Sequence, residues 1–309
     1  NYIGDDAFRT GLTAYFKKHA YGNTTGNDLW VALTKASGVD IAAFMNPWLE
    51  RSGFPVITVA KSGDELTLTQ RHFLDSMQEA DDARLWPVPL FGAASETPVL
   101  TDASGVYPAT IADEAGIINS GGREHYIVQY TDSAQREALT QAVASHKIGE
   151  IDRLMLLNSS AMTARAGLSH FDETLQLMTA YRGEASETVW DILSMVIADA
   201  KRFIDRAPAI ESVLKSLIID LPAEQLTRLG WVEQPGESPE DQKLRATILG
   251  LNSYADNDAV TTEAVDLFGR YAAGETTIVS AELRGIVFAS AVKANADGAV
   301  DFLLETYRT

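Results

Sequence analysis

The spacing of the apolar residues changes twice along the chain, and this change constrains the fold more than any other feature. In residues 1–52 apolar side chains recur every three to four positions, the period of an amphipathic helix. From Pro55 the period becomes two, which is typical of strands, and after Tyr130 the helical period returns. The sequence therefore predicts helices, then a short β region, then a long helical region.

The first helical region contains two apolar stripes, which we expect to be buried. They are formed by Phe8, Leu12, Tyr15 and Phe16, and by Ile41, Phe44, Met45, Trp48 and Leu49. Asp40 is in position to cap the second helix, and Gly38 to end the helix before it.

The β region consists of short apolar stretches separated by Pro, Gly and Asp. Ile57 and Val59 alternate with polar neighbours, a turn follows at residues 61–64, and Leu66 and Leu68 return on the next strand. Further strand-like stretches are residues 86–91, 98–101 and 126–130. This pattern predicts a small antiparallel sandwich.

The last region is a series of helices with short connections, for example residues 151–166, 189–203 and 283–293. Ser238 followed by Pro239 and Glu240 is a strong start signal for a helix. Helix pairs without long loops favour a HEAT-like helical stack.

The string YIGDDAFRTGLTAYFKKHAYGNTTGNDLW and the later AFMNPWLERSGFPVITV resemble a junction in zinc aminopeptidases of the aminopeptidase N and puromycin-sensitive type. There the last helices of the catalytic domain are followed by a small β-sandwich. LTLTQRHF, WPVPL, Leu229-Gly230-Trp231, Leu244-Arg245 and Leu283-Arg284 extend the resemblance towards the C-terminus. It implies a multidomain α+β fold with terminal helices of a thermolysin-like catalytic domain in residues 1–52, an immunoglobulin-like sandwich in 53–131 and an α-helical superhelix, truncated, in 132–309.

The zinc motif of that family, HExxH with a downstream Glu, is missing from the chain. The five histidines are never three or four residues apart: His19, His72, His125, His146 and His170. The resemblance therefore implies that the metal helix precedes residue 1, with zinc in the parent enzyme. It implies no catalytic, cofactor-binding or metal-ligating residue in this chain. The family's Tyr-Arg-Val-x-Tyr strand is also changed, with Ile127 in place of the Arg.

Composition limits the remaining classes of function. A net charge of −18, from 25 Lys and Arg against 43 Asp and Glu, disfavours binding to nucleic acid or anionic lipid. No apolar run approaches the roughly 20 residues that span a membrane, and there is no cysteine. We therefore expect a cytoplasmic protein without nucleic-acid or membrane partners.

Three short motifs are weak. Glu79, Asp81 and Asp82 are interpreted as solvated loop charges, and residues 256–263 lack the glycine and the Glu spacing of a calcium loop. Residues 120–122 are too short to cradle a phosphate. The five tryptophans are expected to be core anchors.

Taken with the resemblance, these observations lead to one main hypothesis. The chain is the non-catalytic C-terminal portion of a zinc aminopeptidase that removes N-terminal residues from peptides, and it forms the wall of the substrate cavity. Its partners would be the catalytic domain of the same polypeptide and peptide substrates. A free-standing helical-repeat scaffold or peptide-binding module without activity is the alternative, and a catalytically dead homologue is the third possibility.

Overall fold

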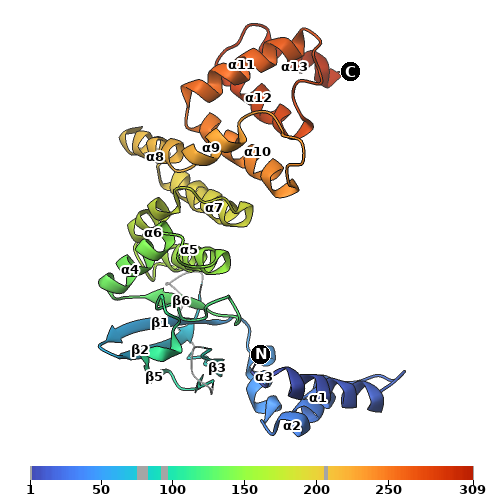
Figure 1. The fold of residues 1–309 in the computed structure, drawn as a ribbon, viewed down its shortest axis with the longest axis vertical. Helices are drawn as coiled ribbons and strands as arrows, with labels where there is room; N and C mark the ends of the chain where they lie inside the picture. Colours follow the sequence, from blue (N-terminus) through green and yellow to red (C-terminus); the bar gives the residue numbers. More distant parts are fainter. Residues whose placement is uncertain (1, 75–82, 92–96, 205–207, 309) are drawn as a thin grey trace. The chain divides into compact units, whose positions relative to one another are not determined.

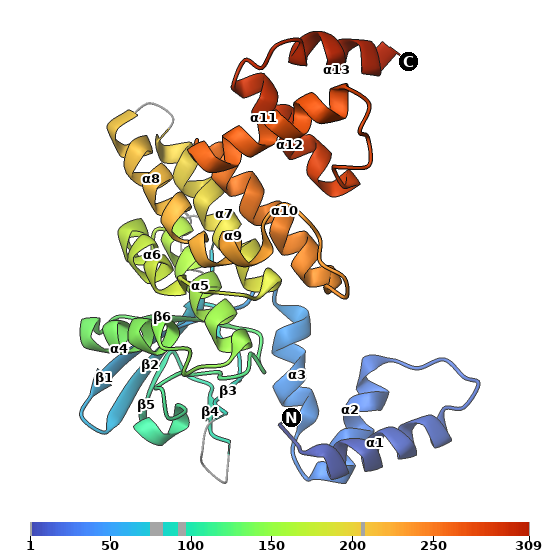
Figure 2. The same ribbon diagram turned by 45° about the horizontal axis from the view of Figure 1, so that its top comes forward.

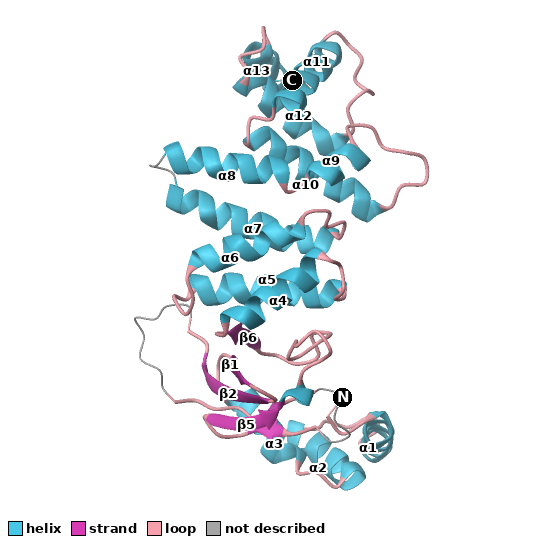
Figure 3. Ribbon diagram, turned by 60° about the vertical axis from the view of Figure 1, so that its left-hand side comes forward, coloured by secondary structure: helices cyan, strands magenta, loops and turns pink. Residues whose placement is uncertain are grey.

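The computed structural model describes residues 2–74, 83–91, 97–204 and 208–308 of the chain. The chain divides into two compact units, Asn1–Thr174 and Leu175–Thr309. All the strands belong to the first unit, and the second consists of helices and loops over its described residues (Figures 1 and 3). The α+β class with a C-terminal helical region is confirmed.

Three helices begin the first unit: α1 (Asp5–Lys18), α2 (Gly26–Ser37) and α3 (Ile41–Glu50). α1 and α2 pack side by side at Gly11, where a Cβ would lie only 2.7 Å from the Leu33 side chain (Figure 2). The predicted ends are confirmed, because the Asp40 carboxylate accepts a hydrogen bond from the Ala43 amide at 3.0 Å and Gly38 is left-handed with φ 75°.

The predicted burial of the two apolar stripes is wrong at several positions. Phe8, Phe16 and Leu49 are 48%, 65% and 65% exposed. The physical reason is that an apolar stripe is buried only where another element packs on it. The side of α1 that packs on α2 is the side of Gly11, which is not a member of the stripe.

The main sheet has four strands in the order β5-β2-β1-β6. They are β1 (Pro55–Ser62), β2 (Glu65–His72), β5 (Ser104–Pro108) and β6 (Ile127–Tyr130). β1 and β2 form the predicted hairpin with Ser62 opposite Glu65, and β2 pairs antiparallel with β5. The expectation of a wholly antiparallel arrangement is wrong at β6, which runs parallel to β1. The connection from β5 is long enough to return the chain to the same end of the sheet, so no tight turn forces the direction.

A second sheet consists of β3 (Val88–Pro89) and β4 (Val99–Leu100). Gln70 of β2 ties it to the main sheet from a nearly inaccessible position. Its amide nitrogen donates to the carbonyls of Trp86, Leu100 and Asp102 at 2.9, 3.2 and 3.0 Å. Its amide oxygen accepts from the Trp86 backbone amide at 3.0 Å. One side chain thus forms hydrogen bonds with four backbone groups, and three of these bonds are buried, where polar groups need partners.

Helices α4 (Ser133–Ala144) and α5 (Glu150–Arg165) cover β6, and α6 (Phe171–Met178) follows them. The second unit contains α7 (Glu187–Ile204), α8 (Pro208–Asp220), α9 (Ala223–Leu229), α10 (Pro239–Tyr254), α11 (Asp258–Ala272), α12 (Ala281–Lys293) and α13 (Ala299–Arg308). The predicted cap at Ser238 is confirmed, since its hydroxyl accepts from the Asp241 amide at 3.1 Å.

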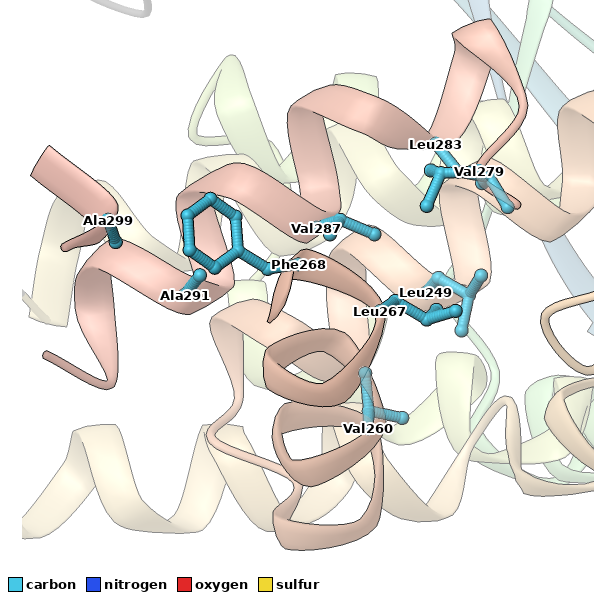
Figure 4. Close-up of a cluster of buried hydrophobic side chains, with 9 residues drawn as sticks. All are labelled: Leu249, Val260, Leu267, Phe268, Val279, Leu283, Val287, Ala291 and Ala299. Carbon is cyan, nitrogen blue, oxygen red and sulfur yellow. The ribbon is translucent and has the colours of Figure 1, made fainter. Parts of the chain in front are cut away.

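The last four helices share a continuous apolar core. Phe268 of α11 lies next to Ala291 of α12, and Leu249 of α10 lies next to Leu267 of α11 (Figure 4). Each helix therefore buries its apolar face against the next helices along the chain, as stacked helical domains require.

Candidate functional site

The five histidines that the sequence analysis considered lie in five separate places. His19 follows α1 and its Nε2 is 4.0 Å from the Asp28 carboxylate, while His72 is buried on β2. His125 packs edge-on against Phe54, with ring centroids 4.9 Å apart. His146 follows α4 in a left-handed conformation, and His170 precedes α6.

Among the described residues, no three His, Asp or Glu side chains gather as a metal-binding group. The sequence also contains no HExxH, the motif by which the resemblance places zinc in the parent enzyme.

Where the structure describes the three weak motifs of the sequence, their residues have structural roles. Glu79, Asp81 and Asp82 lie outside the described residues. Asn257 caps α11 by accepting from the amides of Ala259 and Val260 at 3.0 and 3.3 Å.

Residues 120–122 are held by a carboxylate instead of holding an anion. The Gly121 amide and the Ser120 hydroxyl donate to Asp152 of α5 at 2.6 and 3.1 Å. Next to this contact, the Tyr130 hydroxyl accepts from the Ile118 amide at 2.9 Å, and burial raises the pKa of Tyr130. Hydrogen bonds therefore hold the loop to both β6 and α5. The sequence analysis missed this role of Asp152, because Asp152 follows the loop by thirty residues.

Ile127, which replaces the family's Arg, is 4% exposed and lies opposite Val56 of β1. An apolar side chain is suited to this position, because a guanidinium there would need a buried partner.

A groove of about 550 Å³ separates α3 from the segment that leads to β3. Arg51, the residue after α3, donates to the Leu85 carbonyl, and Trp48 of α3 donates to the Pro87 carbonyl at 3.2 Å. Arg84 reaches back to the carbonyl and hydroxyl of Ser52 at 3.0 and 2.7 Å. These hydrogen bonds therefore link the end of α3 and the two residues after it to the segment that leads to β3.

Five large apolar side chains on α1–α3 and on the loop between α1 and α2 are exposed. We call this set of residues the N-terminal face, and it comprises Phe8, Phe16, Tyr21, Val31 and Leu49, each 48% or more exposed. Exposed large apolar side chains on neighbouring helices are what a surface that another protein segment covers would present.

The second unit contains a largely buried ion pair. Arg245 of α10 is 1% exposed, and its guanidinium contacts Glu237 of the preceding loop and donates to the Leu229 carbonyl at 3.2 Å. A more exposed pair lies nearby, where Arg228 of α9 donates to Asp241 at 2.6 Å.

The Arg228–Asp241 pair gives the second unit a predictable acid sensitivity. The hydrogen bond from Arg228 lowers the pKa of Asp241 below its ordinary value of 3.8. A carboxyl group whose pKa is lower in the folded state stabilises that state above its unfolded pKa, and this contribution disappears as pH falls through the folded pKa. We therefore expect Asp241→Asn to cost stability at pH 6 and almost nothing near pH 2, which hydrogen exchange of α9 and α10 at both pH values measures. An equal cost at both would contradict this origin.

No helix in the described ranges is both long and apolar enough to cross a lipid bilayer.

Comparison with known proteins places these features in a family. Residues 117–309 match the ERAP1-like C-terminal domain, and residues 1–48 match the Peptidase family M1 domain. Aminopeptidase N of Lactococcus lactis subsp. lactis (strain IL1403) is 32% identical over 99% of this chain and 36% of its own length. Aminopeptidase N of Lactobacillus helveticus is 32% identical with the same coverage. The alanine/arginine aminopeptidase of Saccharomyces cerevisiae is 26% identical, again over 99% of this chain and 36% of its own length. The chain thus spans about a third of the length of these relatives.

Proposed function

Since the chain belongs to the M1 aminopeptidases, as a C-terminal portion with an ERAP1-like C-terminal domain, we propose that it is the non-catalytic part of a zinc enzyme that removes N-terminal residues from peptides. In this proposal residues 1–52 complete the catalytic domain, residues 53–131 form a spacer, and the helices from residue 132 line the cavity that holds the peptide. The observation that carries the proposal is the match of both ends of the chain to successive parts of one peptidase architecture.

The share of the relatives that the chain covers supports this division of labour. It aligns with 36% of the Lactococcus lactis aminopeptidase N, and only residues 1–48 match the peptidase domain model. The chain itself carries no HExxH. We therefore assign metal binding and water activation to the remainder of the peptidase domain.

The N-terminal face supports the same assignment. Its side chains lie on or between the helices that match the peptidase domain. We infer that the remainder of this domain, from the same polypeptide, covers Phe16 and Leu49 and removes their apolar surface from water.

An activity assay separates the chain from its parent. The chain alone, given Zn²⁺ and a chromogenic aminoacyl substrate, should show no turnover that a chelator abolishes. The polypeptide in which the chain is preceded by the remainder of its peptidase domain should show such turnover. Chelator-sensitive turnover by the chain alone would contradict the proposal, and inactivity of both would favour the dead homologue.

A further inference from the structure

Three lysines from three different helices converge on the C-terminal end of α10. The ammonium groups of Lys201 (α7), Lys215 (α8) and Lys293 (α12) lie 3.5, 5.7 and 6.0 Å from the centroid of the Tyr254 ring. A net charge of −18 makes such a concentration of positive charge unexpected in this chain.

One carboxylate holds two of these lysines together. Asp256, two residues beyond Tyr254, accepts from Lys215 at 2.8 Å and also contacts Lys293. Both lysines hold the pKa of Asp256 below its ordinary value, so the carboxyl group is charged at neutral pH. Lys293 also donates to the carbonyls of Ser253 and Tyr254 at 3.0 and 3.1 Å, where the helix end is electronegative.

The backbone at Asp256 is held in an unfavourable conformation. Its φ is 59°, in the left-handed region that residues other than glycine seldom adopt, although Asn and Asp tolerate it best. This conformation turns the chain between α10 and α11 and leaves the carboxylate in contact with α8 and α12.

We propose that Asp256 acts as an electrostatic pin, which keeps α7 and α8 docked on α10 and α12 by offsetting the mutual repulsion of three lysines. A second carboxylate, Glu211 of α8, pairs with Lys215 at 2.9 Å. Without the charge of Asp256, Lys293 would have no carboxylate partner among the described residues, while its ammonium group and that of Lys201 would stay near the same Tyr254 ring. The lysines would then change from stabilising to destabilising groups.

The change in the effect of the lysines, from stabilising to destabilising, distinguishes the proposed role of Asp256 from that of an ordinary surface ion pair. Added salt weakens attraction and repulsion alike over distances comparable to the Debye length of about 10 Å at 0.1 M. Salt should therefore loosen the docking in the unmodified chain and tighten it in Asp256→Asn. Asparagine is the appropriate replacement, because it tolerates the left-handed backbone and removes only the charge.

Hydrogen exchange of α8 in the full chain, at about 0.05 and 0.5 M NaCl, tests the pin. We expect Asp256→Asn to exchange about five- to tenfold faster than the unmodified chain at low salt, and to slow when salt is added. Asp266→Asn is the matched control, because its partner Arg270 keeps a second carboxylate in Glu275, and it should behave like the unmodified chain.

A second variant tests the repulsion directly. Lys201→Met should accelerate exchange of α8 in the unmodified chain and slow it in Asp256→Asn. Two results would contradict the proposal. One is that Lys201→Met accelerates hydrogen exchange of α8 in both backgrounds. The other is that added salt changes the exchange of α8 in Asp256→Asn in the same direction as in the unmodified chain and in the Asp266→Asn control.

Discussion

Arg245→Met is expected to destabilise the C-terminal unit by about 3–5 kcal/mol, the typical cost of removing one partner of a buried ion pair. The two side chains are 1% and 8% exposed, so water does not replace the lost guanidinium around Glu237. The Leu229 carbonyl loses a donor as well, while the hydrogen bond that remains to the Glu237 carboxylate among the described residues comes from the Gln234 amide at 3.3 Å. Methionine fills much of the arginine's volume, so most of the cost comes from the unpaired carboxylate.

The matched control is Arg228→Met, in which a similar pair is broken nearer the surface. Arg228 and Asp241 are 42% and 28% exposed, so this change should cost about 1 kcal/mol or less. Hydrogen exchange of α10 measures both variants within the unit concerned, which avoids assuming that two compact units unfold together. The double variant Arg245→Met/Glu237→Leu should recover most of the loss. Equal effects of the two single changes would show that burial does not determine the cost.

The importance of Arg245 could not be read from the sequence. Within a helix, an arginine beside a leucine is ordinarily a solvated residue. Its burial depends on the loop that folds back from α9 and delivers Glu237, eight residues earlier, to the guanidinium. Helical periodicity contains no information about such a loop. The motif Leu244-Arg245 was informative only through resemblance.

Strand alternation, in contrast, contained a signal for the polar core of the β region. The inward positions of β2 are Leu66, Leu68, Gln70 and His72. Alternation predicted the strand and its facing, and two polar residues on the apolar face indicate that buried partners must exist. The partners of Gln70 are backbone groups of the second sheet, which no pattern in the sequence identifies. The direction of β6 was unpredictable for a related reason, because alternation is the same in parallel and antiparallel strands.

The apolar stripe of α1 shows the limit of periodicity most clearly. The period of Phe8, Leu12 and Tyr15 predicted a helix, and α1 is confirmed. An apolar stripe indicates that one face of a helix packs on another element, but it does not identify that element. Within this chain α2 packs on α1 at Gly11. The exposure of Phe16 is therefore informative about function, because it marks the surface that the proposed catalytic remainder would cover.

Placing negative charge on the N-terminal face should strongly reduce turnover without unfolding the chain. Phe16 and Leu49 are both 65% exposed, so Phe16→Asp/Leu49→Asp removes little buried surface from the chain itself. In the polypeptide that also carries the remainder of the peptidase domain, the change would sacrifice about 1.5–3 kcal/mol of apolar burial for each side chain and place two carboxylates in the interface. We expect chelator-sensitive turnover to fall about 100-fold or more, since each 1.4 kcal/mol of lost docking energy is about a tenfold effect.

The contrast between two proteins makes this last prediction specific. Hydrogen exchange of α1–α3 in the isolated chain should be the same with and without the two substitutions, which excludes a simple folding defect. Val232→Asp is the control for surface charge, because Val232 is similarly exposed at 68% but belongs to the other compact unit. It should leave turnover of the longer polypeptide unchanged. If Phe16→Asp/Leu49→Asp also leaves turnover unchanged, these side chains remain in water in the assembled protein, and residues 1–52 do not complete a catalytic domain through this face.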